Sequence, residues 1–264
     1  MDRLERATRL DPQNAQTMLM LAGTRAGRRQ YAVADSLFDR TIALEPDSPD
    51  AYWEKSANLL SWRGSVTEAR AIVAGIPGQS TDSRLFADSW YDLFDRDFAA
   101  AADKLGRTDP AQLTSARARA EYYELYGDVL RRLGRTDESR RVYERGVETI
   151  LAEQARTSAP RQASEGLAVL HAYLGDEAEA RRFMQESRDA RPDDRFYAVQ
   201  GLFGDAVVEM LLGDQDAAID IIASLLEWEY FMPLSVNDLR LDPVWDPLRD
   251  HPRFQQLLAD HAES

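Results

Sequence analysis

The sequence contains no cysteine and no uninterrupted apolar run of eighteen residues. Without cysteine the chain forms no disulfide, thiol nucleophile or zinc–thiolate site. That absence suits both the cytoplasm and an oxidising periplasm, so the compartment stays open. The start, MDRLERATRL, is polar and charged, so the sequence predicts neither a signal peptide nor a membrane-spanning helix. We therefore expect a soluble chain.

An excess of basic residues is also missing. Lys and Arg number 32 against 46 Asp and Glu, which gives a net charge of −14. Such a surface repels phosphate backbones and anionic lipids, so nucleic acid and membrane surfaces are not expected partners. The apolar share of 44% is large enough to build a core, which separates this sequence from disordered chains.

The chain carries an internal repeat that is visible in its turns. Pro12, in RLDPQN, and Pro46, in ALEPDS, lie 34 residues apart in matching contexts. Later periods contain a residue expected to end a first helix in the left-handed conformation, a role that glycine fills best. These turn positions hold Gly64, Arg96, Gly134, Gly175 and Gly213.

Counted from these turns, two positions in every period hold only small residues. The first holds Ala22, Ser56, Ser89, Gly127, Ala168 and Ala206, and the second holds Ala34, Ala69, Ala101, Ser139, Ala180 and Ala218. A third position holds a residue able to wedge between units: Phe38, Val73, Leu105, Tyr143, Met184 or Ile222. An ordinary helical bundle, the alternative, does not require small residues at two regular positions.

With these residues the sequence resembles the tetratricopeptide-repeat family, whose unit is a helix–turn–helix. The resemblance implies an all-α fold, a right-handed superhelical solenoid of about six units. The expected segments are a lone second helix at 1–14, repeats at 15–48, 49–79, 82–110, 120–155, 161–192 and 199–226, and a cap at 227–264. The lone helix places Leu4, Ala7 and Leu10 on one side, as if the chain were cut from a longer array.

The last segment contains LRLDPVWDPLRDHPRFQQLL, residues 239–258. Its Asp242-Pro243, Asp246-Pro247 and His251-Pro252 pairs predict short helix starts and chain breaks, ending in a helix from about Pro252 to Asp260. Its apolar residues would cover the last repeat; they are Leu241, Trp245, Leu248, Phe254, Leu257 and Leu258.

The same stretch resembles the end of tetratricopeptide regions in multidomain bacterial signalling proteins. Those proteins carry receptor-type serine/threonine kinase, nucleotide-cyclase or transcription-regulator modules. The resemblance implies a sensory or scaffolding part whose catalytic module is not in this chain.

The sequence contains no motif typical of catalysis. Phosphate-binding loops, dinucleotide fingerprints, HExxH and GxSxG are absent. His171, His251 and His261 are far apart in sequence, and GDQDAAID lacks the glycine and glutamate of a calcium loop. We therefore predict no enzyme activity, no cofactor and no metal.

The family resemblance identifies candidate residues for a concave groove lined by the first helices. They are Trp53, Glu54, Phe86, Trp90, Glu121, Glu124, Asp128, Phe203 and Val207. The resemblance implies a non-enzymatic protein–protein interaction module whose peptide or protein partner carries apolar anchors and basic flanks. A carboxylate clamp is excluded, because Leu19 and Gly23 stand where its Lys and Asn would be.

Two alternatives remain open at this stage. Trp53, Phe86 and Trp90 either face the groove or pack as core, because a slip of one residue rotates a helix face by roughly 100°. The chain could instead be a self-association domain that drives homo-oligomerisation of its parent protein.

Overall fold

The computed structural model describes residues 2–76, 82–155, 160–190, 195–228 and 234–261. Within these ranges every regular element is an α-helix or a short 3-10 helix, and no strand occurs. The all-α class expected from the sequence is confirmed. The chain divides into two compact units, each described by itself below.

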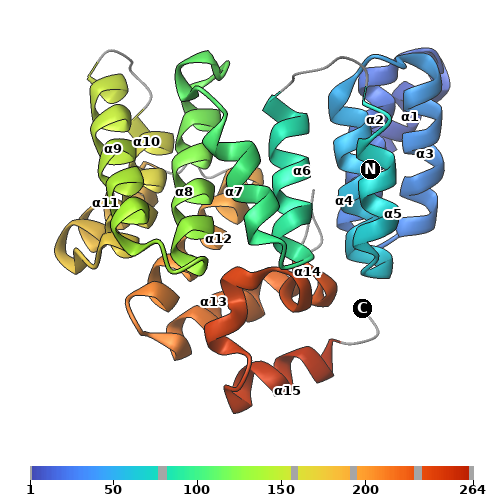
Figure 1. Ribbon diagram of the computed structural model, residues 1–264. Helices are drawn as coiled ribbons and strands as arrows, with labels where there is room; N and C mark the ends of the chain where they lie inside the picture. Colours follow the sequence, from blue (N-terminus) through green and yellow to red (C-terminus); the bar gives the residue numbers. More distant parts are fainter. Residues whose placement is uncertain (1, 77–81, 156–159, 191–194, 229–233, 262–264) are drawn as a thin grey trace. The chain divides into compact units, whose positions relative to one another are not determined.

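The first unit comprises residues 1–95, 226–245 and 255–264. Its helices are α1 (Asp2–Leu10), α2 (Ala15–Gly27), α3 (Tyr31–Leu44), α4 (Pro49–Arg63), α5 (Val66–Val73), α6 (Asp82–Phe94) and α14 (Val236–Leu241). The helices α2 and α3 pack together as one pair, and α4 and α5 as the next (Figure 1). The lone helix α1 packs against α2, with Thr8 buried and Leu10 77% exposed.

The second unit comprises residues 96–225 and 246–254. Its helices are α7 (Phe98–Gly106), η1 (Pro110–Gln112), α8 (Ala116–Arg132), α9 (Thr136–Gln154), α10 (Pro160–Leu174), α11 (Glu177–Asp189), α12 (Arg195–Leu211) and α13 (Gln215–Leu226), which ends at the boundary. The pairs α8–α9 and α10–α11 stand side by side (Figure 1).

Side-chain caps fix where several helices begin. Asn14 accepts a hydrogen bond from the Thr17 amide at 2.8 Å at the start of α2. Ser115 accepts one from the Ala118 amide at 3.0 Å, and α8 therefore begins at Ala116. Such caps satisfy amides that have no partner within the helix.

The turns between paired helices follow the sequence pattern. Gly64, Gly134, Gly175 and Gly213 all have positive φ, a conformation that costs glycine nothing. Arg96 takes the same conformation, with φ of 61°, and so does Arg29, with φ of 55°. The five predicted turn residues therefore have the expected conformation, one of them an arginine, and Arg29 is a further turn residue that the sequence analysis did not name.

The small residues lie where the paired helices meet. All twelve are buried, and so are the six large residues of the third position. Gly127 shows why size matters: a Cβ added there would lie 2.1 Å from Cε1 of Tyr143. The Tyr143 ring in turn stacks on Tyr173, with centroids 4.7 Å apart. The absent side chain at position 127 thus sets the spacing between α8 and α9.

The C-terminal segment is divided between the units. Residues 226–245 belong to the first unit, where α14 packs against α4. Residues 246–254 belong to the second, where Gln215 at the start of α13 donates a hydrogen bond to the Pro247 carbonyl at 3.1 Å. Trp245, Leu248 and Phe254 are completely buried.

Not every predicted break of this segment occurs. The helix η2 runs from Pro243 to Leu248 with Pro247 inside it, so the Asp246-Pro247 pair starts no new helix. A six-residue 3-10 helix tolerates the proline because the Arg249 amide still bonds to the Asp246 carbonyl at 3.2 Å. The last helix, α15 (Pro252–Asp260), has the expected bounds.

We expect Gly127→Ala to lower the free energy of unfolding by about 1–3 kcal/mol, because overpacking forces Tyr143 from its site. The matched control is Gly204→Ala in α12, where the nearest atom to an added Cβ is Cγ of Glu165 at 3.4 Å. That change should stabilise the protein by about 0.5–1 kcal/mol through helix propensity. Urea unfolding of both variants decides the matter, and equal effects at the two positions would contradict the close approach.

Candidate partner-binding surface

Three of the four aromatic candidates, Trp53, Phe86 and Trp90, lie in the first unit, on α4 and α6. Phe86 is only 6% exposed and belongs to the core. Trp53 is partly buried and packs against a core cluster that includes Tyr91, with ring centroids 6.4 Å apart. Trp90 is partly buried beside Phe94, with centroids 5.9 Å apart. The three side chains therefore differ in how much surface they leave for a partner.

The core cluster beneath Trp53 is held in register by a buried hydrogen bond. The Tyr91 hydroxyl donates to Oγ of Ser56 at 2.7 Å, and both side chains are buried. Burial raises the pKa of Tyr91 to about 12, so this phenol stays a neutral donor. The bond ties α6 to α4 directly below the aromatic surface.

Glu54 follows Trp53 on α4 and has an oxygen atom without a hydrogen-bond partner among the described residues. Its Oε2 atom is buried, and no hydrogen bond reaches it within the described structure. Burial, followed by repulsion from Asp50, raises the pKa of Glu54 to about 8. A half-buried carboxyl in this state can accept a hydrogen bond from a ligand or give up its proton to one.

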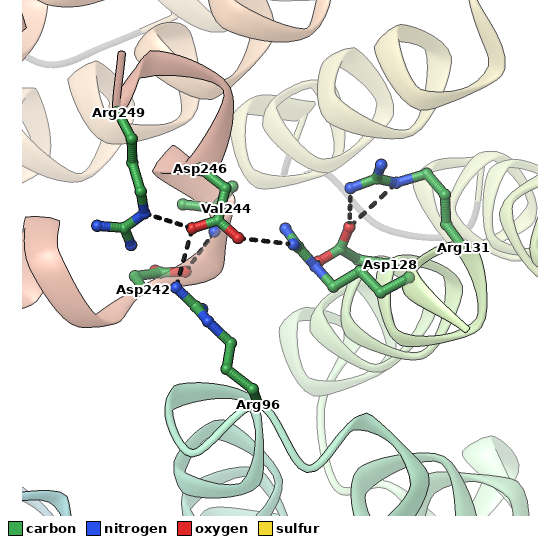
Figure 2. Close-up of polar contacts among 8 residues, drawn as sticks. Arg96, Asp128, Arg131, Asp242, Val244, Asp246 and Arg249 are labelled. Atoms are coloured by element: carbon green, nitrogen blue, oxygen red, sulfur yellow. Dashed lines mark hydrogen bonds and ion pairs between the residues drawn. The ribbon is translucent and has the colours of Figure 1, made fainter. Parts of the chain in front are cut away.

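The other three acidic candidates, Glu121, Glu124 and Asp128, lie on α8 in the second unit. Glu121 and Glu124 are partly exposed, whereas Asp128 is buried. The Asp128 carboxylate already accepts hydrogen bonds from Arg131 and, at 2.6 Å, from Nε of Arg132. Figure 2 shows this pairing at the end of α8. Asp128 is therefore engaged within the fold, whereas Glu121 and Glu124 are partly exposed on the same helix.

Glu124 lies against the neighbouring first helix, α10. A Cβ added at Gly166 would come within 3.2 Å of Oε1 of Glu124, so the missing side chain leaves room for the carboxylate. Burial raises the pKa of Glu124 well above its ordinary value, with Glu121 and Glu165 adding repulsion and Arg117 opposing them. The spacing of α8 and α10 thus concentrates negative charge along their first-helix face.

The last two candidates lie on α12. Phe203 is partly exposed, whereas Val207 is 5% exposed and belongs to the core. The sequence reasoning missed two buried carboxylates on the same helix, Asp205 and Glu209, which bond to Arg188 at 2.9 Å and Arg181 at 3.1 Å. These contacts fasten α12 to α11. An arginine and an acid on successive helices of a repeat array were the available signal.

The nine candidates fall into two separate sets. Trp53, Glu54, Phe86 and Trp90 belong to the first unit, and Glu121, Glu124, Asp128, Phe203 and Val207 belong to the second. The aromatic and acidic sets are therefore two candidate surfaces, each with its own chemistry. That one partner binds both surfaces stays a prediction.

No metal-binding cluster emerges from the described residues. Within them, no group of three or more His, Asp or Glu side chains is placed to hold a metal ion. His171 stacks on Phe183, with centroids 5.4 Å apart, as a packing residue does. No helix in the described ranges is long and apolar enough to cross a membrane.

One family comparison matches this geometry. Residues 120–149, which lie in α8 and α9, match the family model of the tetratricopeptide repeat. No curated protein matches the chain significantly. The helix pair α8–α9, with Gly127 against Tyr143, is thus the part of the chain recognised as this repeat.

The chain is also similar to a solved structure described as "Functional Characterization of Pseudomonas Aeruginosa pilF". The two are 13% identical with a TM-score of 0.47, over 93% of this chain and 97% of that one. The likeness carries no argument about function at these values. The repeat match supports the tetratricopeptide-repeat family and, with it, the class of protein–protein interaction scaffolds.

Glu54 generates a prediction about pH. Its pKa is raised in the folded state, so the folded chain binds more protons than the unfolded chain between about pH 4.5 and pH 8. Stability from this group is therefore lost as the pH rises through that window. Glu54→Gln should remove this loss. The free energy of unfolding of the variant, relative to wild type, should therefore be about 1–2 kcal/mol higher at pH 9 than at pH 4.

The measurement is the free energy of unfolding across that pH range. The matched control is Glu148→Gln, which changes an exposed glutamate on α9 and should leave the pH profile unaltered. If Glu54→Gln keeps the wild-type slope, Glu54 is not the group that titrates.

Proposed function

We propose that the chain is a non-enzymatic interaction module that binds a peptide or protein along the first helices of its repeats. The observation that carries the proposal is the recognised helix pair α8–α9, whose first helix presents Glu121 and Glu124, both partly exposed. Repeat arrays of this kind expose extended faces that suit elongated partners. The likeness of its C-terminal stretch to bacterial signalling proteins supports a place within a larger protein of that type.

The chemistry of the two candidate surfaces supports a partner with apolar anchors and basic flanks. Trp90 and Trp53 offer aromatic surface, and large apolar groups supply most of the affinity at protein interfaces. Glu121, Glu124 and Glu165 offer negative charge, which mainly speeds the encounter with Lys or Arg side chains. Asp128 is omitted from this proposal because it is buried.

Self-association is the second candidate, favoured by a specific observation in the first unit. Leu10, Met20 and Val33, on α1, α2 and α3, are 77%, 49% and 48% exposed. Exposed apolar side chains of this size are candidates for an interface between copies.

Trp90→Ala should weaken binding of an interacting peptide by at least about 2 kcal/mol, because an aromatic anchor would be lost. Its stability should change little if Trp90 faces the partner. Trp62→Ala is the matched control, since Trp62 is a partly exposed tryptophan of α4 outside the candidate set. Calorimetry and thermal melts of both variants separate the cases: an unfolded Trp90→Ala protein would make Trp90 core and remove it from the surface.

Replacing Glu121 and Glu124 together by Gln should slow association about 3- to 10-fold at low salt and hardly alter dissociation. Stopped-flow binding over a salt series measures both rates. The control is Glu148→Gln on α9. An association rate that the double variant shares with wild type would contradict the acidic surface.

Light scattering over a concentration series tests self-association. If the Leu10, Met20 and Val33 side chains form the interface, wild type shows a concentration-dependent dimer and Leu10→Ser weakens it. A monomer at all concentrations removes this second candidate.

A further inference from the structure

Two turn residues of the repeat array carry strain that the sequence could have avoided. At the turns after α4, α8, α10 and α12 a glycine takes the positive φ. At the turns after α2 and α6 the residue is arginine, Arg29 or Arg96, with φ of 55° and 61°. Among the described residues these are the two non-glycines with positive φ, a conformation that crowds a Cβ against the backbone. Such outliers persist where the side chain does something glycine cannot do.

Arg29 reaches the C-terminal part of the chain within the first unit. Its guanidinium donates a hydrogen bond to the carbonyl of Leu226, the last residue of α13. The charge of an arginine is favourable beside the carbonyls that end a helix. A glycine at position 29 would relieve the turn but leave this carbonyl without its donor.

The turn after α4, in the same unit, holds the helix α14. Asn237 of α14 donates a hydrogen bond to the Ser61 carbonyl at 3.0 Å, and Oγ of Ser61 donates to Asp238 at 3.0 Å. Gly64 leaves room for the Asn237 side chain, because an added Cβ would lie 3.1 Å from its Oδ1. Asp238 also accepts from the Ser235 amide at 2.9 Å, closing the capping box of α14. The end of α4 is therefore shaped to receive a short capped helix.

Arg96 makes the corresponding contact within the second unit. Its Nη2 donates to Oδ1 of Asp246 at 2.9 Å, and Nε of Arg249 donates to the same atom at 2.6 Å (Figure 2). Arg132, at the end of α8, reaches Oδ2 at 3.4 Å. Further along the segment, Arg253 pairs with Asp216 at 2.6 Å on α13. One carboxylate thus collects three guanidinium groups: one from a repeat turn, one from the end of α8 and one from the C-terminal segment itself.

We propose that the turn side of the repeats docks the C-terminal segment within each unit: residues 226–228 and 234–245 in the first unit, and residues 246–254 in the second. Arg29 and Arg96 stand in glycine positions because each holds the part of the segment that belongs to its own unit. The surface recognises carbonyl and carboxylate acceptors on short helices. It is chemically distinct from the first-helix faces proposed above for a partner.

The direction in which Arg96→Gly changes stability and amide protection tests this proposal. If Arg96 serves the turn alone, Arg96→Gly relieves strain and stabilises the protein. If it holds the segment, the amides of Arg249 and His251, bonded to Asp246 and Leu248, lose protection. We expect their hydrogen exchange in the full chain to speed up by at least ~5-fold, and the effect of the substitution to shrink at high salt.

The matched control is Gly134→Arg, which places an arginine in the equivalent turn after α8. It should lower the melting temperature through turn strain without speeding exchange at Arg249 and His251. Arg29→Gly is an independent test in the first unit, for which hydrogen exchange is measured at the amides of Leu239 and Asp242. Combining Arg96→Gly with Asp246→Asn should add nothing to the exchange of Asp246→Asn alone. Unchanged or slower exchange in Arg96→Gly, with a raised melting temperature, would overturn the proposal.

Discussion

The close approach of paired helices is the constraint on which the other features of this chain depend. It requires small residues at two positions of every pair, and all twelve of them are buried. At Gly127 even a methyl group would overlap the Tyr143 ring. Because the backbones come so near, Tyr143 of the third position packs against Gly127 within its own helix pair and stacks on Tyr173 of the next pair. The packing of the paired helices therefore determines which face of each first helix stays exposed.

In this acidic chain, arginine side chains pair with the buried carboxylates close to them. Asp128, Asp205 and Glu209 are buried carboxylates, and each bonds to a guanidinium group. The fork of arginine satisfies two acceptor directions at once, which makes burial of an acid tolerable. Glu54 and Glu124 are different: burial and neighbouring acids raise the pKa of each. Both carboxyl groups are therefore held closer to their neutral form than an exposed glutamate.

Much of the fold was predictable because it rests on short-range rules. Small residues at regular positions and glycines at turns fix helix pairs without reference to distant parts of the chain. The face of each helix was harder to predict, because Trp53, Phe86 and Trp90 differ in burial although they occupy neighbouring repeat positions. That difference arises from Tyr91 and Phe94, whose packing is set by tertiary contacts. The ion pairs of Asp128 could not be predicted from the sequence either. The spacing places Arg131 and Arg132 on the same helix, but it does not determine their side-chain rotamers.

The C-terminal segment could not have been placed from its own composition. Its prolines and apolar residues indicate a cap, and Trp245, Leu248 and Phe254 are buried as a cap requires. The partners of its polar residues are long-range: Asn237 and Asp238 meet Ser61, and Asp246 meets Arg96 and Arg132. The available signal was a departure from pattern, an arginine where other repeats have glycine. In a repeat array, a residue that breaks the repeat at a strained position points to a contact outside the repeat, and here that contact lies in the C-terminal segment.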